Sequence, residues 1–237
     1  MESLSPVTIA FAFIGGMLPA WVWLHFLLKE DSRCPEPRYL IGVAFLAGML
    51  AVPLAIPFQS LAAQYFNDGL PVIVAWAAVE EMLKYGLAAL LVLWRRSVNE
   101  TIDLVIYMLT VALGFAALEN ALFLFGPLAD GRILDGIVTN NLRFIGSTLL
   151  HVMASSAVGF ALALAYLKTR PMRTVYVTGG LILAITLHSL FNFLIIHADG
   201  SHTLFAFLVV WAVAIIFFAL FEVLKYFRYR HLPKNTC

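Results

Sequence analysis

The chain has 237 residues, of which 62% are hydrophobic and only 12% are charged, and its formal net charge is +1 at pH 7. Soluble domains are about 45–50% apolar and about 25% charged, so this composition excludes a soluble globule and indicates an integral membrane protein. Nucleic-acid binding is excluded by the same composition, and the two cysteines, Cys34 and Cys237, are too few for a disulfide framework.

Seven apolar runs are long enough to cross a bilayer, whose hydrocarbon core of about 30 Å needs roughly 20 helical residues. Because backbone polar groups in lipid must be satisfied within their own segment, we expect each run to be a helix. The fold prediction is an all-α polytopic membrane bundle of about seven transmembrane helices in one domain, residues 1–237. The runs cover residues 5–28, 39–60, 71–94, 99–125, 142–167, 174–196 and 203–224.

Several residues punctuate these runs. Pro53 and Pro57 are expected to break the second run near its end. Ser97 and Glu100 have the spacing of a capping box, which predicts the start of the fourth helix. Pro127 is expected to end that helix.

The basic residues predict an orientation. Twelve Lys and Arg residues follow the first, third, fifth and seventh runs, whereas the opposite side carries only Arg132 and Arg143. The positive-inside rule therefore places the N-terminus outside and the C-terminus, with both cysteines, in the cytoplasm. The remaining basic residue, Lys84, lies within the third run.

Ionisable and amide side chains lie inside four runs, although a charge at a helix centre costs about 2.5–3.5 kcal/mol on insertion scales. At a rise of about 1.5 Å per residue, four of these side chains fall in one layer, roughly 9–14 Å below the outer ends of their predicted spans. They are Glu80, Glu119, His151 and His188. Unrelated packing residues would scatter in depth, so we expect one functional cluster. Its members are Glu80, Glu81, Lys84, Glu119, Asn120, His151, His188 and Asn192.

Helical spacing adds local geometry to this cluster. Glu80 and Lys84 are four residues apart, which favours an ion pair, and Lys84 also reaches Glu81. His188 and Asn192 share a helix face in the same way. On the fifth run small residues follow His151 at one-turn intervals and favour close helix packing.

The formal charge of the cluster is −2 with neutral histidines, because three glutamates stand against one lysine. A divalent cation or two shared protons would neutralise it. Each group alone could be structural, Glu80 and Glu81 as an ion pair with Lys84, and His151 as a hydrogen-bonded packing residue. Their common depth favours function.

The residue types narrow the chemistry to a glutamate-centred hydrolase. The zinc motif H-E-x-x-H is absent, and no aspartate lies deep in a run to form an aspartyl dyad. Ser155 or Ser156 with His188 would make a serine nucleophile, but it would leave the glutamates unexplained.

Four motifs in chain order are similar to those of the PrsW family of intramembrane proteases, within the CAAX-processing and bacteriocin-processing membrane endopeptidases. Residues 80–84 read E-E-x-x-K, 115–120 read F-x-x-x-E-N, 151–159 read H-x7-G and 188–192 read H-x-x-F-N. The wider group usually carries His where this chain has Glu119, and its prenyl-protein members work from the cytosolic side. Both differences favour the PrsW branch.

This resemblance implies an endopeptidase of the bacterial cytoplasmic membrane that cleaves a single-pass membrane protein, such as an anti-sigma factor, on the extracytoplasmic side. Glu80 is expected to be the general base that activates water, with Glu81 as the alternative. Lys84 would hold whichever carboxylate is not catalytic. His188 and Asn192 would polarise the scissile carbonyl or stabilise its oxyanion.

Glu119 and His151 would position the water, or would form a zinc site with His188, since two histidines and a glutamate are a ligand set of zinc hydrolases. Asn120 belongs to the catalytic set through its motif. The sequence leaves glutamic protease and metalloprotease both open, and a divalent metal such as zinc is an optional cofactor.

Two other classes compete with this interpretation. Buried Glu, His and Lys also form the proton relays and ion sites of transporters, but paired halves with interrupted helices are not seen in the sequence. A catalytically silent bundle that binds a membrane partner is the third class, and the intact motifs weigh against it.

Overall fold

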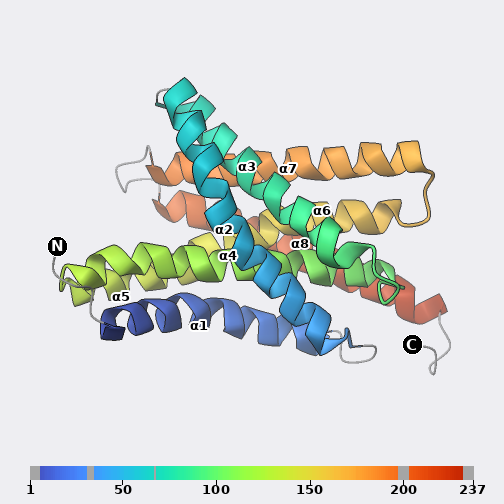
Figure 1. Ribbon diagram of the computed structural model, residues 1–237. Helices are drawn as coiled ribbons and strands as arrows, with labels where there is room; N and C mark the ends of the chain where they lie inside the picture. The colour runs from blue at the N-terminus through green and yellow to red at the C-terminus, as the bar shows by residue number, and fades with distance from the viewer. Residues whose placement is uncertain (1–5, 31–34, 67, 197–202, 232–237) are drawn as a thin grey trace.

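The structure, a computed structural model, describes residues 6–30, 35–66, 68–196 and 203–231, and its long segments are all helical (Figure 1). Cys34 and Cys237 lie outside the described residues. The helices are α1 (Pro6–Glu30), α2 (Arg38–Phe66), α3 (Leu70–Ala88), α4 (Thr101–Ala129), α5 (Ile133–Leu142), α6 (Thr148–Ala165), α7 (Arg170–Ile196) and α8 (Thr203–His231).

The predicted all-helical membrane bundle is confirmed. Among the described residues, six segments are long and apolar enough to cross a membrane. The remaining predicted span, the third run, is α3 with its π-helical extension Ala89–Leu93, and Glu80, Glu81 and Lys84 set it apart from the other six. The fifth span begins earlier than residue 142, because α5, a π-helical turn at Arg143–Ser147 and α6 form one continuous apolar segment.

Three prolines do not end helices as predicted. The helix α2 runs through Pro53 and Pro57 to Phe66, and α4 continues past Pro127 to Ala129. Proline is tolerated in membrane helices because neighbouring helices and local adjustments satisfy the backbone groups that it frees.

The predicted capping box of α4 is wrong by three residues. Glu100 was expected as the partner of an N-cap at Ser97, but Glu100 is itself the N-cap and its partner is Asp103. The Asp103 carboxylate accepts hydrogen bonds from the backbone N–H groups of Asn99 at 2.9 Å and Glu100 at 2.8 Å. A carboxylate in the first turn satisfies these otherwise unpaired donors and complements the helix dipole, so Asp103 fixes the start of the helix three residues after the predicted one.

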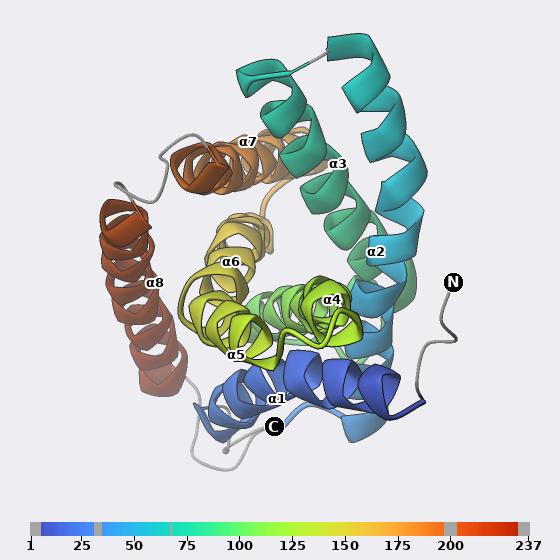
Figure 2. The same cartoon turned by 90° about the vertical axis from the view of Figure 1, so that its left-hand side faces the viewer.

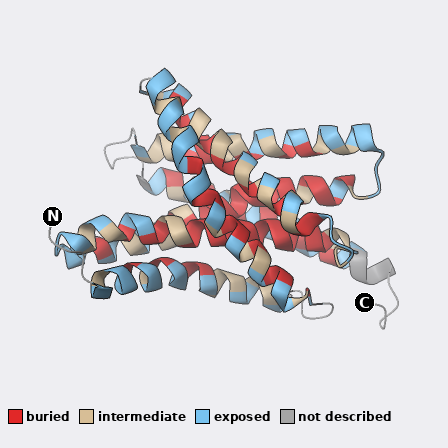
Figure 3. Cartoon of the chain, viewed as in Figure 1, coloured by how far each residue is buried: buried red, intermediate tan, exposed pale blue. Residues whose placement is uncertain are grey.

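The helix α4 is the centre of the bundle, with α1, α2 and α6 packed around it (Figure 2). Buried positions cover nearly its whole length (Figure 3). Its crossing with α2 is close because Gly114 lies against the backbone of Phe45 and Gly48 lies against that of Val111. A Cβ at either glycine would stand 1.9 Å from a carbonyl oxygen of the other helix, so these positions allow no side chain.

Small residues continue this close packing towards α7. Gly159 of α6 lies against α4, where a Cβ would be 3.0 Å from the Cα of Val105, as the predicted small-residue face requires. Gly180 of α7 packs on Ala157 and Ala161 of α6 in the same way. These contacts fix α4, α6 and α7, and α3, which carries Glu80, Glu81 and Lys84, packs against α2 and α7.

Candidate active site

A cavity of about 670 Å³ lies where these helices meet. Its walls come from the C-terminal halves of α2, α4 and α7, the N-terminal halves of α3 and α8, and the π-helical turn with the start of α6. These are the helix ends that the charge count predicts to lie outside. The polar side chains that line it are Gln59, Ser60, Trp76, Glu80, Glu119, Arg143, Ser147, His151, His188 and Asn192.

Glu81 lies behind the cavity wall with both oxygens engaged. Its Oε1 accepts hydrogen bonds from Lys84 Nζ at 2.8 Å and from His188 Nδ1 at 2.9 Å. Its Oε2 accepts one from the Ser155 hydroxyl at 2.9 Å. The side chain is fully buried, so this carboxylate is held as an anion in a fixed position.

Glu80 is the neighbour of Glu81 in sequence but faces the cavity. Its Oε1 accepts a hydrogen bond from Gln59 Nε2 of α2 at 2.8 Å. Its Oε2 is buried and has no hydrogen-bond partner, while Lys84 Nζ stands 3.9 Å and His188 Nε2 3.6 Å away. Since a buried carboxylate oxygen ordinarily has a partner, this atom is the free acceptor of the cluster.

The partners of the two histidines determine their tautomers. Glu81 is a carboxylate, so His188 Nδ1 donates to it, and in the neutral ring Nε2 is an acceptor directed at Glu80. Lys84 is only a donor, so His151 Nδ1 accepts from it at 2.9 Å. His151 Nε2 then carries the proton and donates to Glu119 Oε2 at 2.9 Å.

Lys84 is a fully buried ammonium at the centre of the cluster. Besides Glu81 and His151, it contacts the face of Phe115, whose ring centroid is 4.1 Å from Nζ. The predicted contacts from Lys84 to both glutamates are present, and the one to Glu81 is the shorter.

Glu119 is engaged by Arg143, for which the sequence predicted only a charge on the outer side. Arg143 Nη2 donates to Glu119 Oε2, and Arg143 Nε donates to Asn120 Oδ1 at 2.6 Å. Asn120 Nδ2 donates in turn to the Thr148 hydroxyl at 2.9 Å. Asn120 is fully buried and supports this ion pair from outside the cavity lining.

Arg143 also changes the charge of the cluster. Three carboxylates now stand against Lys84 and Arg143, which leaves a net formal charge of −1 with neutral histidines, instead of −2. One proton therefore neutralises the group, and a divalent ion is not required by charge alone.

A metal ion nevertheless fits three of these residues. Glu80, His151 and His188 each offer a ligand atom, and these atoms lie within 4.8 Å of one another. The unpartnered Glu80 Oε2 supports this fit. The predicted ligand set took its carboxylate from Glu119, but that side chain is bound to Arg143 and His151, and Glu80 takes its place beside the histidines.

The sequence missed Gln59 and Arg143, and their partners lie 21 and 24 residues away along the chain. Trp76 supports Gln59, because its Nε1 donates to the Gln59 carbonyl at 2.9 Å. The available signal was polarity inside or beside apolar runs, but Gln59 lies near the end of its run and Arg143 was counted only as a charge of the outer side.

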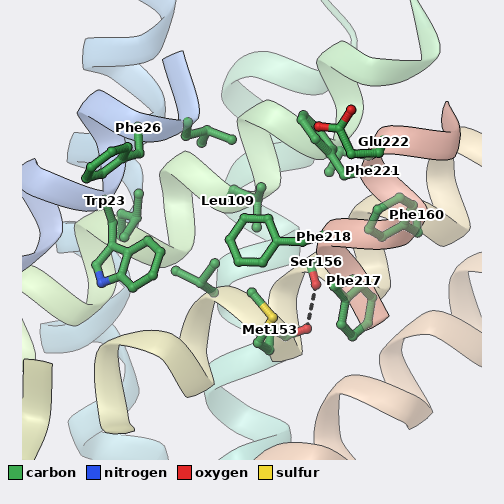
Figure 4. A pocket seen from close by; sticks show the side chains of 14 residues that line it. Trp23, Phe26, Leu109, Met153, Ser156, Phe160, Phe217, Phe218, Phe221 and Glu222 are labelled. Atoms are coloured by element: carbon green, nitrogen blue, oxygen red, sulfur yellow. Dashed lines mark hydrogen bonds between the residues drawn. The ribbon is translucent and has the colours of Figure 1, made fainter. Parts of the chain in front are cut away.

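A second cavity, of about 360 Å³, lies between α1, α4, α6 and α8 (Figure 4). Its lining is almost wholly apolar and aromatic, and its side chains with polar atoms are Trp23, Ser156 and Glu222. The Ser156 hydroxyl donates to the Met153 carbonyl at 2.7 Å, and Glu222 pairs with Lys225 at 2.6 Å. No base and nucleophile meet there, so the polar cavity is the candidate active site.

The chain is similar to known proteins over most of its length. Residues 36–221, which include all residues of the polar cavity, match a family described as PrsW family intramembrane metalloprotease. A relative named Protease PrsW from Oceanobacillus iheyensis is 24% identical over 224 residues, which cover 93% of this chain and 95% of the relative. No solved structure gives a significant match.

Two further relatives carry the same name. The Bacillus subtilis protein is 25% identical over 189 residues, covering 78% of this chain and 83% of the relative. The Clostridioides difficile protein is 23% identical over 190 residues, covering 77% and 78% respectively.

Proposed function

The chain belongs to the PrsW family of intramembrane metalloproteases, and from this membership we propose that it hydrolyses a peptide bond of a single-span membrane protein of the anti-sigma-factor kind. We expect the scissile bond near the extracytoplasmic side of the bilayer. The position of the cavity, at the helix ends predicted to lie outside, supports this location.

The observation that carries the mechanism is the difference between the two adjacent glutamates. Glu81 has no free oxygen, whereas Glu80 belongs to the cavity lining and its Oε2 is unpartnered. A general base must be within hydrogen-bond reach of the proton that it takes. Glu80 therefore accepts the proton of the attacking water, and Glu81 holds Lys84 and His188 in place.

The other cavity residues follow from their hydrogen-bonding capacity. Glu80 Oε2 and His188 Nε2 are acceptors 3.6 Å apart, so one water can donate a hydrogen to each and direct its lone pair at the scissile carbon. With His188 Nε2 used as an acceptor, the Asn192 amide is the donor for the developing oxyanion. This reduces the role first expected of His188 to holding the water.

A divalent metal ion would be held by Glu80, His151 and His188. Bound there, such an ion supplies Lewis-acid polarisation of the water and the scissile carbonyl. The Lys84 ammonium lies 3.9 Å from Glu80 Oε2 and 2.9 Å from His151 Nδ1. It therefore competes electrostatically with a cation, and Glu81 reduces this competition by pairing with it.

The test is cleavage in proteoliposomes that contain the purified full chain and single-span substrates. Wild-type protein should yield two fragments whose masses locate the cut in the outer half of the span. The variant Glu80→Gln should give none, and the control Glu222→Gln should cut normally, because Glu222 is 65% exposed and pairs with Lys225. Cleavage that persists in Glu80→Gln would overturn the mechanism.

Metal analysis of the same wild-type sample distinguishes the two catalytic types. About one equivalent of zinc, lost in His188→Ala but kept in His25→Ala, supports the metalloprotease route. Wild-type protein that is active without bound metal supports a glutamic protease, in which the Glu80 carboxylate activates the water without a metal ion.

A further inference from the structure

We propose that Arg143 is a positioning residue of this active site, which acts through Glu119 on the ring of His151. The inference rests on the proposed function and extends it to a residue outside the four motifs. Arg143 lies eight residues before His151, on the π-helical turn that joins α5 to α6. Single π-helical turns within α-helices are frequent at functional sites, because they redirect side chains.

The guanidinium of Arg143 is held on three sides. It donates to Glu119 Oε2 and to Asn120 Oδ1, and it lies over the ring of Phe123 at 3.9 Å from the centroid. Its side chain is only 14% exposed. Asn120 is itself fixed by Thr148, so the ion pair is braced at both ends by buried groups.

The same oxygen of Glu119 connects Arg143 to the catalytic cluster. Glu119 Oε2 accepts from Arg143 on one side and from His151 Nε2 on the other. With the Glu119 carboxylate kept anionic by Arg143, it can only accept from His151, and Nδ1 is left as the acceptor for Lys84. The ion pair therefore orients the His151 ring and, together with Lys84, fixes its tautomer.

Arg143 differs from Arg132, which has comparable ion pairs but no link to the cluster. Arg132 pairs with Asp130 at 2.9 Å and with Asp135 at 3.1 Å, and its side chain is 55% exposed. Exposed ion pairs of this kind contribute little to the stability of a protein. Arg132→Gln is therefore a matched control that removes a guanidinium from two carboxylates close by in the chain.

Two of the donor groups of Arg143 are already used within the protein. Nε and Nη2 are used by Asn120 and Glu119, and the ring of Phe123 covers one face. We therefore expect changes at Arg143 to lower kcat and leave KM nearly unchanged. Removal of a group that orients a ligating or catalytic histidine costs about 10–100-fold.

The experiment is a double-mutant cycle in proteoliposomes with one single-span substrate. Arg143→Gln and Glu119→Gln should each lower kcat by about 10–100-fold, and the double variant should be no slower than the slower single variant. Arg143→Lys should recover part of the rate, since lysine keeps a positive charge beside Glu119 but lacks the second hydrogen bond, to Asn120. Arg132→Gln should match the wild type.

Three results would overturn the inference. Multiplicative losses in the double variant would show that Arg143 does not act through Glu119. An increase in KM at unchanged kcat would show direct substrate binding, and wild-type kinetics in Arg143→Gln would remove any role. If wild-type protein does not cleave at all, the proposed function fails instead, so the two failures are distinguishable.

Discussion

Two adjacent glutamates on α3 have opposite surroundings, and this difference organises the site. Glu81 is surrounded by Lys84, His188 and Ser155, whereas Glu80 keeps one oxygen free at the cavity. Consecutive residues of a helix point about 100° apart, so α6 and α7 can enclose one and leave the other open. Environment rather than residue type separates a structural anion from a base.

Glu81→Gln should lower the free energy of unfolding by about 3–5 kcal/mol, because it leaves the buried Lys84 ammonium without its anion. Thermal or denaturant unfolding in a mild detergent would measure this loss. Glu222→Gln, at an exposed ion pair, should stay within about 1 kcal/mol of the wild type. A stable Glu81→Gln variant would mean that Lys84 finds its compensation elsewhere.

The residue-scale prediction from sequence was strongest where both partners lie on one helix. Spacings of three and four residues correctly brought Lys84 to both glutamates. Gln59 and Arg143 were missed because their partners lie on other helices, and helical periodicity says which face a residue occupies but not which neighbour it meets. The sequence could not choose between Glu80 and Glu81 for the same reason.

Among the elements, α4 holds the others in position through contacts that leave no room for side chains. Its crossing with α2 depends on Gly48 and Gly114, each against a carbonyl of the partner helix. Because Gln59 of α2 binds Glu80 of α3, the position of α2 on α4 also affects the cavity. The packing of the bundle and the geometry of the site are coupled at this crossing.

Gly48→Ala should destabilise the protein by about 1–3 kcal/mol or more, since the added methyl overpacks the crossing with α4. Gly42→Ala is the matched control on the same helix, because a Cβ there meets nothing within 4 Å. Melting temperatures of the two variants in detergent would measure the difference. Equal melting temperatures would show that α2 and α4 separate at little cost.

The element boundaries show where sequence rules for soluble proteins failed. Pro53, Pro57 and Pro127 lie inside α2 and α4 although each was expected to break or end its helix. In a membrane, a helix that ended at a proline would expose unpaired backbone groups to lipid. A proline therefore does not end a membrane helix as readily as it ends a helix in water. Span number was predictable, because hydrocarbon thickness sets a minimum length for each run.

At the scale of the whole molecule, the protein is a membrane bundle with its polar cavity near one end. The helix halves that form this cavity are those predicted to lie outside by the distribution of Lys and Arg. A site in the outer half suits cleavage of a substrate on the extracytoplasmic side. The orientation is therefore part of the functional proposal.

An impermeant maleimide tests the orientation in intact cells. The native Cys34 and Cys237 should react only after permeabilisation, because both are predicted to be cytoplasmic. Asp68→Cys, at an exposed position between α2 and α3, should add one thiol that reacts from outside. Labelling of the wild-type protein in intact cells, with no additional labelling of Asp68→Cys, would show that the topology is the reverse of the predicted one.

The single-turnover rate of substrate cleavage in carboxylate variants tests most directly whether Glu80 is the base. General-base catalysis contributes about 10²–10⁴-fold, so Glu80→Gln should lose at least that factor at an unchanged melting temperature. Glu119→Gln should lose only about 10–100-fold, as expected for a residue that orients His151. A Glu80→Gln rate within tenfold of the wild type, with Glu119→Gln inactive, would contradict the account.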